Sequence, residues 1–141
     1  MQKINVGIVG GAGYTGGELL RVLLRHPQVH INFVHSTSSA GQLVSAVHTD
    51  LLGDTELVFT NNLIDNVDLL FLCVGHSEAS QFLENHSIAT TTKIIDLSQD
   101  FRCAPSQQQG SRNFIYGLPE LNKKAIQSAH NIANQIGRAH V

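Results

Sequence analysis

The feature that most constrains this chain is a concentration of glycine near its start, in "GIVGGAGYTGGEL" (residues 7–19). Glycine costs roughly 0.5–1 kcal/mol relative to alanine inside regular structure. A cluster of glycines therefore indicates that another group comes very close to the backbone there. The stretch follows the apolar run "INVGIV" and leads into a helical pattern, which predicts a turn from a strand into a helix.

The glycines match a dinucleotide-binding fingerprint. Residues 11–16 fit the pattern G-x-G-x-x-G, and glycines also recur at positions 10, 13 and 16. After a strand and before a helix, this motif holds a pyrophosphate on the helix N-terminus. A turn that merely connects strand and helix is the alternative. The candidate cofactor-binding residues of this stretch are Gly10, Gly11, Gly13, Tyr14, Thr15 and Gly16.

Apolar runs alternate with helical patterns along the chain. Strands are predicted at 4–9, 29–36, 55–60, 66–74, 92–98 and 131–134, and helices at 17–27, 40–48, 77–86 and 119–130. Strands and helices in this order predict parallel βαβ units. We therefore expect an α/β fold with a doubly wound, mostly parallel sheet, a Rossmann-type dinucleotide-binding domain over residues 1–134. The polar stretch 103–113 is expected to be an exposed loop.

The residues expected at the ribose end of the site favour NADP(H) over NAD(H). An NAD site normally carries Asp or Glu about 20 residues after the glycines, at the end of the second strand. This chain has "HSTSS" there, without a carboxylate. The hydroxyls of Ser36, Thr37 and Ser38 can donate hydrogen bonds to a phosphate. An ordinary polar turn with Ser39 as helix cap is the alternative.

The apolar run at 66–74 leads into a further candidate segment, "LCVGHSEAS". Ligands of doubly wound sheets lie beyond the carboxyl ends of the strands, so Gly75 and His76 are expected beside the cofactor. A supporting or surface role for His76 is the alternative. Ser77 is a candidate cap for the next helix. Cys73 is expected to be a buried core thiol, because no base accompanies it.

Composition and charge argue against several classes of partner. A formal net charge of -2 gives no electrostatic reason to expect nucleic acid or a membrane surface. No apolar run approaches the roughly 20 residues of a membrane helix. The two cysteines are not arranged as a disulfide scaffold, so we expect a cytoplasmic protein.

Pro27 separates the histidines of the one i, i+4 pair, and no metal site is expected. Charged residues make up only 14%, against roughly 25% in typical domains, which indicates surface covered by another domain or subunit.

Several segments together resemble one enzyme family. They are "STSSAG", "HTDLLGDTEL", "FLCVGH", "DLSQDFR" and "YGLPELN". With the glycine fingerprint, they make residues 3–134 closely resemble the N-acetyl-gamma-glutamyl-phosphate reductases, the NADPH-dependent enzymes of arginine biosynthesis. Similar glycine loops recur in aspartate-semialdehyde dehydrogenases, which are an alternative, whereas "DLSxDFR" and "YGLPE" are more specific to the first family.

The resemblance implies an oxidoreductase that reduces an acyl phosphate in two steps. A cysteine thiolate displaces phosphate to give a thioester, NADPH then delivers hydride to form the semialdehyde, and a histidine acts as acid and base. It also places Ser98 and Arg102 at the cleft for the small-molecule substrate, where a guanidinium suits a phosphate or carboxylate. A structural turn network of Asp96, Asp100 and Arg102 is the alternative. The full-length enzyme is expected to be a homo-oligomer.

The segment that holds the nucleophile in this family is not found here. In the family, Pro-Gly-Cys directly follows the strand that here reads "NIAN" (131–134), but this chain continues with "QIGRAHV". We therefore expect a cofactor-binding part without a catalytic residue, without the second domain, and inactive by itself. Residues 135–141 are predicted to be a non-native tail, because 136–141 can be encoded by ATC GGA AGA GCA CAC GTC, a sequencing-adapter stretch. Cys103 precedes a polar loop without a partnering base and is not expected to be the nucleophile.

Two further functions remain as alternatives. A nucleotide-sugar epimerase or oxidoreductase normally carries Tyr-x-x-x-Lys, but Tyr14 and Tyr116 are followed four residues later by Glu18 and Glu120. A non-catalytic module that binds NADP(H) also fits the chain as it stands.

Overall fold

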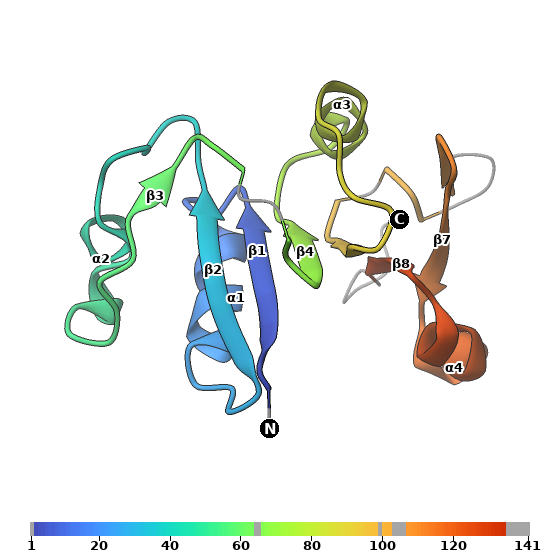
Figure 1. The fold of residues 1–141 in the computed structure, drawn as a ribbon, viewed down its shortest axis with the longest axis horizontal. Coiled ribbons are helices and arrows are strands. Elements are labelled where there is room, and N and C mark those ends of the chain that lie inside the picture. The colour runs from blue at the N-terminus through green and yellow to red at the C-terminus, as the bar shows by residue number, and fades with distance from the viewer. Residues whose placement is uncertain (1, 64–65, 99, 103–106, 135–141) are drawn as a thin grey trace, which may run out of the picture.

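The computed structural model describes residues 2–63, 66–98, 100–102 and 107–134 (Figure 1). Cys103 and the predicted non-native tail, 135–141, lie outside the described residues. The elements in chain order are β1 (Ile4–Val9), α1 (Tyr14–Leu23), β2 (Val29–His35), α2 (Val44–Val47), the 3-10 helix η1 (Thr49–Leu51), β3 (Phe59–Thr60), β4 (Leu69–Leu72), α3 (Glu78–Asn85), β5 (Lys93–Asp96), β6 (Gln108–Gln109), β7 (Arg112–Gly117), α4 (Pro119–Ser128) and β8 (Asn131–Asn134). None of the described helices is long and apolar enough to cross a lipid bilayer.

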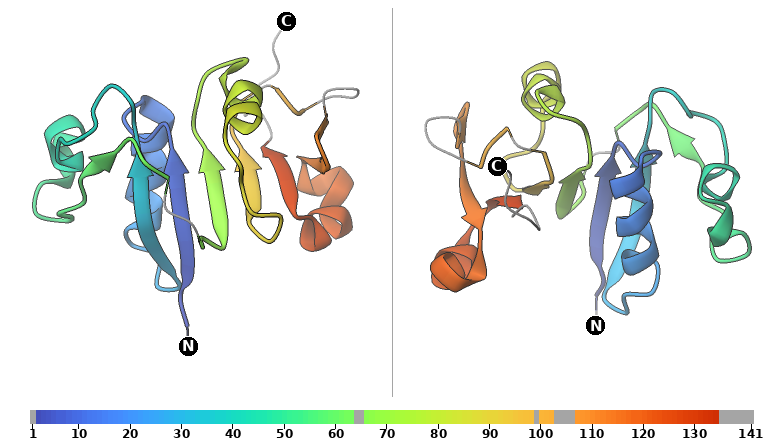
Figure 2. Two further views of the ribbon diagram at one scale, coloured as in Figure 1. Left: turned by 45° about the horizontal axis from the view of Figure 1, so that its top comes forward. Right: turned by 180° about the vertical axis from the view of Figure 1, so that it is seen from behind.

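The described strands form one eight-stranded sheet in the order β3-β2-β1-β4-β5-β8-β7-β6 (Figure 2). All neighbouring strands are parallel except β6 and β7, which form an antiparallel hairpin. The chain winds outward from β1 to β3 and then returns to β4 on the other side of β1. Such a reversal leaves a crevice at the carboxyl ends of the strands. The predicted doubly wound, mostly parallel, Rossmann-type sheet is confirmed.

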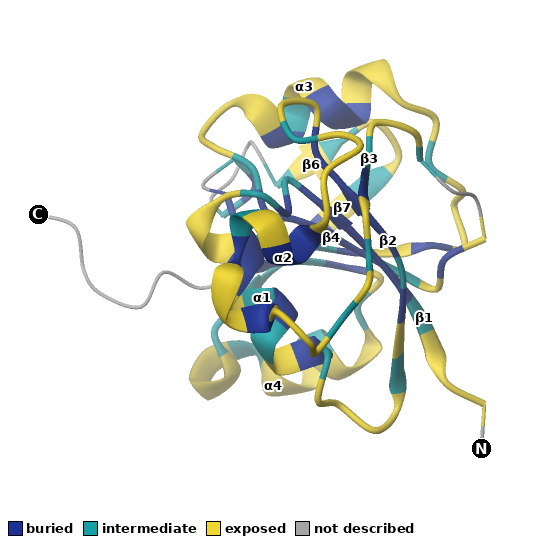
Figure 3. Ribbon diagram, turned by 90° about the vertical axis from the view of Figure 1, so that its left-hand side faces the viewer, coloured by how far each residue is buried: buried dark blue, intermediate teal, exposed yellow. Residues whose placement is uncertain are grey.

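Each face of the sheet is covered by its own hydrophobic cluster. On one face, Ile8 of β1 packs in a cluster with Leu20 of α1. On the other face, Leu72 of β4 packs in a cluster with Phe82 and Leu83 of α3. Figure 3 shows buried residues along the strands and on α1 and α3. Because successive side chains of a strand point to opposite faces, one sheet supports both clusters.

Several element boundaries differ from those predicted. Helix α1 begins at Tyr14 instead of residue 17, because Gly16 and Gly17 form part of its first turn. The helix expected at 40–48 is reduced to the four residues of α2 followed by η1. The loop expected at 103–113 is wrong in its second half, where β6 and the start of β7 pair. A two-residue strand in a polar stretch carries no alternating apolar pattern that would predict it.

An ion pair fastens α1 to η1. Nε of Arg21 donates to Oδ2 of Asp50 at 2.6 Å, and Nη2 donates to Oδ1 at 2.8 Å. The guanidinium lowers the pKa of the Asp50 carboxyl to about 2. A bidentate pair of this kind fixes orientation as well as distance, so α1 and η1 hold a defined mutual position.

Candidate functional site

The glycine-rich loop, residues 10–13, connects the carboxyl end of β1 to α1. Gly10 has a φ of +77°, a conformation that favours glycine. The N–H groups of Gly10 and Gly11 both donate to the carbonyl oxygen of His35, each at 3.0 Å. The loop is therefore fixed to the last residue of β2.

Two glycines of this region pack too closely to accept a side chain. A β-carbon at Gly11 would overlap Val34, and one at Gly16 would lie 2.6 Å from Cα of Gly11 and 2.7 Å from the carbonyl oxygen of Gly10. These contacts bring the first turn of α1 against the glycine-rich loop and β2. Close packing between helix and sheet is one of the roles that the fingerprint assigns to its glycines.

At Gly13, no packing contact within the protein excludes a side chain. It is exposed, its φ of -80° and ψ of 178° are open to any residue, and an added β-carbon would meet only the carbonyl oxygen of Gly10, at 3.9 Å. Neither backbone conformation nor internal packing explains a glycine at this position. A ligand that approaches the backbone here supplies a physical reason for it.

The N-terminus of α1 is suited to an anion. No side chain caps the helix at Gly13, and its first turn carries no acidic residue. Tyr14 and Thr15, the first two helical residues, are exposed. A ten-residue helix that begins in this way presents backbone N–H groups and the positive end of its dipole.

His48 supports the glycine-rich loop from behind. Its ring is buried, and Nε2 lies 2.7 Å from the carbonyl oxygen of Gly11. The ring also fills the space beside Gly17, where a β-carbon would lie 2.6 Å from Cε1. Phe59 of β3 meets the same ring edge to face, with centroids 6.3 Å apart. His48 therefore links the loop to the edge of the sheet.

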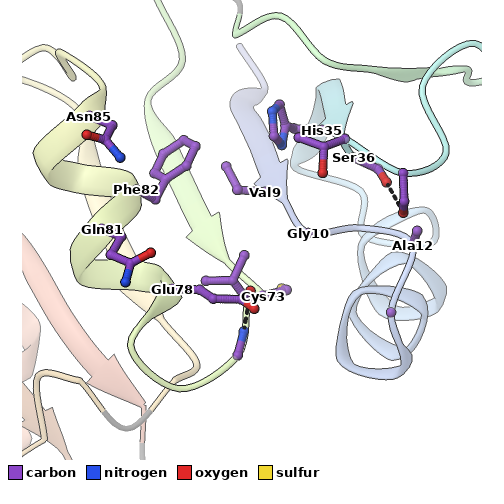
Figure 4. Close-up of a pocket in the computed structure, with 15 residues that line it drawn as sticks. Val9, Gly10, Ala12, His35, Ser36, Cys73, Glu78, Gln81, Phe82 and Asn85 are labelled. Carbon is purple, nitrogen blue, oxygen red and sulfur yellow. Dashed lines mark hydrogen bonds between the residues drawn. The ribbon is translucent and has the colours of Figure 1, made fainter.

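A cavity of about 420 Å³ opens at the carboxyl ends of β1, β2 and β4 (Figure 4). Six of the predicted cofactor-binding residues line it: Gly10, Gly13, Ser36, Thr37, Ser38 and Gly75. Across from the glycine-rich loop, Gln81, Phe82 and Asn85 of α3 form the opposite wall (Figure 4). The cavity therefore joins the loop, the hydroxyl-bearing residues after β2 and one face of α3.

The wall after β2 carries hydroxyl groups and no acidic residue. Oγ of Ser36 accepts a hydrogen bond from the N–H of Ser39 at 3.1 Å and lies 3.4 Å from Oγ of Ser38. Thr37 and Ser38 are exposed. The alternative in which Ser39 caps a helix is wrong, because α2 begins only at Val44. The hydroxyls are therefore held in a turn at the cavity.

Gly75 and His76 occupy different places. Gly75 lines the cavity, and its N–H donates to Oε2 of Glu78 at 3.1 Å. His76 is exposed and does not line the cavity; its Nδ1 lies 3.4 Å from Oδ1 of Asp100. Cys73 is buried, as expected, and burial together with the charge of Asp96 raises the pKa of its thiol to about 12. The thiol is therefore protonated at neutral pH and is no nucleophile.

Ser98 and Arg102 take part in hydrogen bonds within the protein. Oγ of Ser98 is buried, donates to Oδ2 of Asp96 at 2.7 Å and accepts from the N–H of Asp100 at 3.1 Å. Nε of Arg102 donates to the carbonyl oxygen of Asn134 at 2.9 Å. These bonds correspond to the structural alternative, a turn network that joins the ends of β5 and β8.

Asp100 extends this network to α3. Its Oδ1 accepts from the N–H of Ser77 at 2.7 Å, and its Oδ2 accepts from the N–H of Ser80 at 3.0 Å. Ser77 stands at the N-cap position but makes no capping bond with its own side chain. The helix that forms one cavity wall is thus capped by a carboxylate from the loop after β5.

We expect Asp100→Ala to lower the free energy of unfolding by about 1–2 kcal/mol, because two N–H groups at the start of α3 lose their acceptor. Urea unfolding of the variant against wild type measures the change. Asp54→Ala, at an exposed turn, is the matched control and is expected to stay within about 0.5 kcal/mol of wild type. Equal midpoints for Asp100→Ala and Asp54→Ala would contradict the capping role.

Sequence reasoning missed His35, His48 and the α3 residues of the cavity wall. Gln81 and Asn85 stand four residues apart on a predicted helix, which places them on one face, but no pattern says that this face meets a ligand cavity. Both histidines gain their neighbours through contacts between segments distant in the chain. A polar residue at the end of the second predicted strand is the signal that could have identified His35.

The parallel sheet, the reversal at β1 and the glycine-rich loop at the crevice define this chain as a Rossmann-type dinucleotide-binding domain. The family model described as "Semialdehyde dehydrogenase, NAD binding domain" matches residues 5–129. The chain belongs to that family.

Curated relatives are about 50% identical to this chain in sequence. The chain is 50% identical over 131 residues to the N-acetyl-gamma-glutamyl-phosphate reductase of Flavobacterium johnsoniae, and 48% identical over 131 residues to that of Christiangramia forsetii. Each alignment covers 93% of this chain and 40% of the relative. The predicted family resemblance is confirmed, and the chain spans about 40% of the length of these relatives.

Solved structures share the fold. An aspartate semialdehyde dehydrogenase with NADP from Candida albicans has a TM-score of 0.63 at 13% identity, covering 94% of this chain and 42% of that one. GenD2 from gentamicin A biosynthesis, in complex with NAD, has a TM-score of 0.60 at 18% identity, covering 95% and 34%.

Proposed function

We propose that this chain is the cofactor-binding part of an NADPH-dependent N-acetyl-gamma-glutamyl-phosphate reductase, with residues 1–134 as the dinucleotide-binding domain. The names of the relatives and the family of the domain support the reaction class. The observation that carries cofactor binding is Gly13, a glycine that faces the cavity and that nothing in the protein itself requires.

The residues of the site fit a dinucleotide. The N–H groups at the start of α1 and the backbone at Gly13 suit a pyrophosphate, which needs hydrogen-bond donors and close access. The cavity continues from there to the hydroxyls of Ser36, Thr37 and Ser38, where the ribose would lie. When bound, the nicotinamide supplies the hydride of the reduction.

The residues that follow β2 at the cavity support binding of NADP(H) rather than NAD(H). An NAD site uses a carboxylate to accept hydrogen bonds from the ribose hydroxyls. Residues 35–41 contain none, so a 2'-phosphate meets hydroxyl donors and no acidic side chain from this turn. We infer a preference for the phosphorylated cofactor.

We propose that the chain by itself does not reduce the acyl phosphate. The reaction class needs a thiolate, and the one described cysteine is buried with a raised pKa. The substrate, the homo-oligomer and the cytoplasmic location are part of the same proposal for the whole enzyme. Ser98 and Arg102 then act by holding the ends of β5 and β8, as their hydrogen bonds support.

Calorimetric titration of the chain with NADPH and NADH tests the proposal. We expect NADPH to bind at least about tenfold more tightly, a difference of about 1.4 kcal/mol. Ser38→Asp adds a negative charge to the wall after β2 and is expected to remove this preference by weakening NADPH. Ser128→Asp, on exposed α4, is the matched control and keeps it. Equal binding of the two cofactors, or no binding of either, would contradict the assignment.

A further inference from the structure

One buried polar group of the cavity wall has no partner. His35 is 7% exposed and lines the cavity, and its Nδ1 makes no hydrogen bond within the part of the chain that the structure describes. A buried polar atom without a hydrogen-bond partner is unfavourable, because it has lost its bonds to water and gained none in the protein. At the wall of a ligand cavity, such an atom indicates that the ligand supplies the partner.

The position of His35 places its ring between the two halves of the proposed cofactor site. Its carbonyl oxygen holds the glycine-rich loop, and the hydroxyl-bearing residues follow it directly in the chain. On the other side Phe82 of α3 meets the imidazole edge to face, with centroids 5.9 Å apart (Figure 4). The ring is therefore held at the cavity wall, next to the segment where we propose that the ribose lies.

We propose that His35 binds the 2'-phosphate of NADP(H) as an imidazolium, so that binding of the phosphorylated cofactor takes up one proton from solvent. This inference rests on the proposed function. The added proton converts the neutral ring into an imidazolium, in which Nδ1 donates a charge-assisted hydrogen bond to a phosphate oxygen. NAD(H) offers a ribose hydroxyl instead, which a neutral imidazole binds without taking up a proton.

The surroundings of His35 favour the neutral ring when no phosphate is near. Burial lowers the pKa of His35, and the charge of His86, when protonated, lowers it further. The other titratable groups at the cavity are Glu78 of α3 and Cys73 after β4, and Cys73 stays neutral because its pKa is raised to about 12. The loop at 10–13 and the turn at 36–38 contribute no titratable side chain.

The direction of the pH effect follows from these charges. A bound phosphate raises the pKa of His35 above its lowered value in the free protein. The gain in NADPH affinity is fully present below the pKa of the free protein and is lost as the pH rises through the pKa of the complex. One pKa unit of difference corresponds to about a tenfold change in affinity.

Adenosine 2',5'-bisphosphate and 5'-AMP form a probe pair that differs only in the 2'-phosphate. We expect wild type to bind the bisphosphate more tightly at about pH 6 than at about pH 8, by roughly fivefold to tenfold beyond the change shown by His35→Asn. Asparagine keeps an N–H donor near Nδ1 but cannot take up a proton, and the titration of the ligand itself is common to both proteins. His30→Asn, at an exposed position of β2, is the matched control and keeps the wild-type pH dependence.

Two measurements on wild type alone keep the test independent of variant folding. Calorimetry at about pH 7.5, where phosphate monoesters with a second pKa near 6 are already dianions, in buffers of different ionisation enthalpy should show proton uptake with the bisphosphate and none with 5'-AMP. NMR of the His35 ring protons should show a pKa that rises with the bisphosphate only. Equal pH dependence in wild type and His35→Asn, or equal proton uptake with 5'-AMP, would overturn the inference and leave the proposed function standing. Failure of NADPH and the bisphosphate to bind at either pH would overturn both.

Discussion

Gly13→Val is expected to weaken NADPH binding by at least about a hundredfold, while the free energy of unfolding falls by no more than about 1 kcal/mol, the cost of losing glycine at the N-cap of α1. The extended backbone at Gly13 suits a β-branched residue, and a β-carbon there finds open space. The isopropyl group would instead occupy the place where a pyrophosphate must approach the start of α1. Binding and folding therefore respond separately to one substitution.

Calorimetric titration with NADPH and thermal unfolding together measure the two effects. Ala125→Val adds two methyl groups on the exposed side of α4 and is expected to leave NADPH binding unchanged, with a loss of at most about 0.7 kcal/mol in the free energy of unfolding from the lower helix propensity of valine. Wild-type affinity in Gly13→Val would show that the pyrophosphate lies elsewhere. Marked destabilisation would show that glycine is required here by the protein itself.

Gly16→Ala is expected to act in the opposite way, lowering the free energy of unfolding by about 3 kcal/mol. Its β-carbon would lie 2.6 Å from Cα of Gly11 and 2.7 Å from the carbonyl oxygen of Gly10. Both atoms belong to the backbone, and the hydrogen bonds to His35 hold that backbone in place. The first turn of α1 must therefore shift away from the loop, and NADPH binding is expected to weaken as a consequence.

Gly13→Ala is the matched control for this variant, because it adds the same methyl group three residues away in open space. Denaturant unfolding of both variants gives the comparison. We expect a loss of about 3 kcal/mol for Gly16→Ala and a loss of at most about 1 kcal/mol for Gly13→Ala, which stands at the N-cap of α1. Similar losses in the two variants would contradict the packing described for the first turn of α1.

Local sequence patterns predicted most of the fold. The apolar runs and helical periods predicted parallel βαβ units, and the sheet has that winding. The exceptions are informative: the β6–β7 hairpin lies in a polar stretch, and α1 extends back into glycines that propensity would exclude from a helix. β7 also pairs with β8, and the first turn of α1 packs against Gly11 and His48, so contacts outside each segment outweigh its local preference.

The residues of the candidate site also fall into two groups: those that the sequence identified and those that only the fold brings together. The glycine-rich loop, the hydroxyls after β2 and Gly75 were identifiable because motif spacing and strand ends are local properties of the chain. The cap that Asp100 places on α3 joins residues 20 and 23 positions apart. The contact of His48 with Gly11 spans 37 positions. No spacing rule predicts these pairs.

By itself, the sequence determined the class of fold, the family and the place of the glycine-rich loop, because periodicity and glycine spacing are set by neighbours in the chain. The tertiary structure alone decided that Gly11 and Gly16 are needed for internal packing and that Gly13, at the cavity, is not. It also decided that His35 is buried at the cavity without a partner. Both distinctions depend on atoms brought together from separate strands and helices, and such distances exist only in the folded chain.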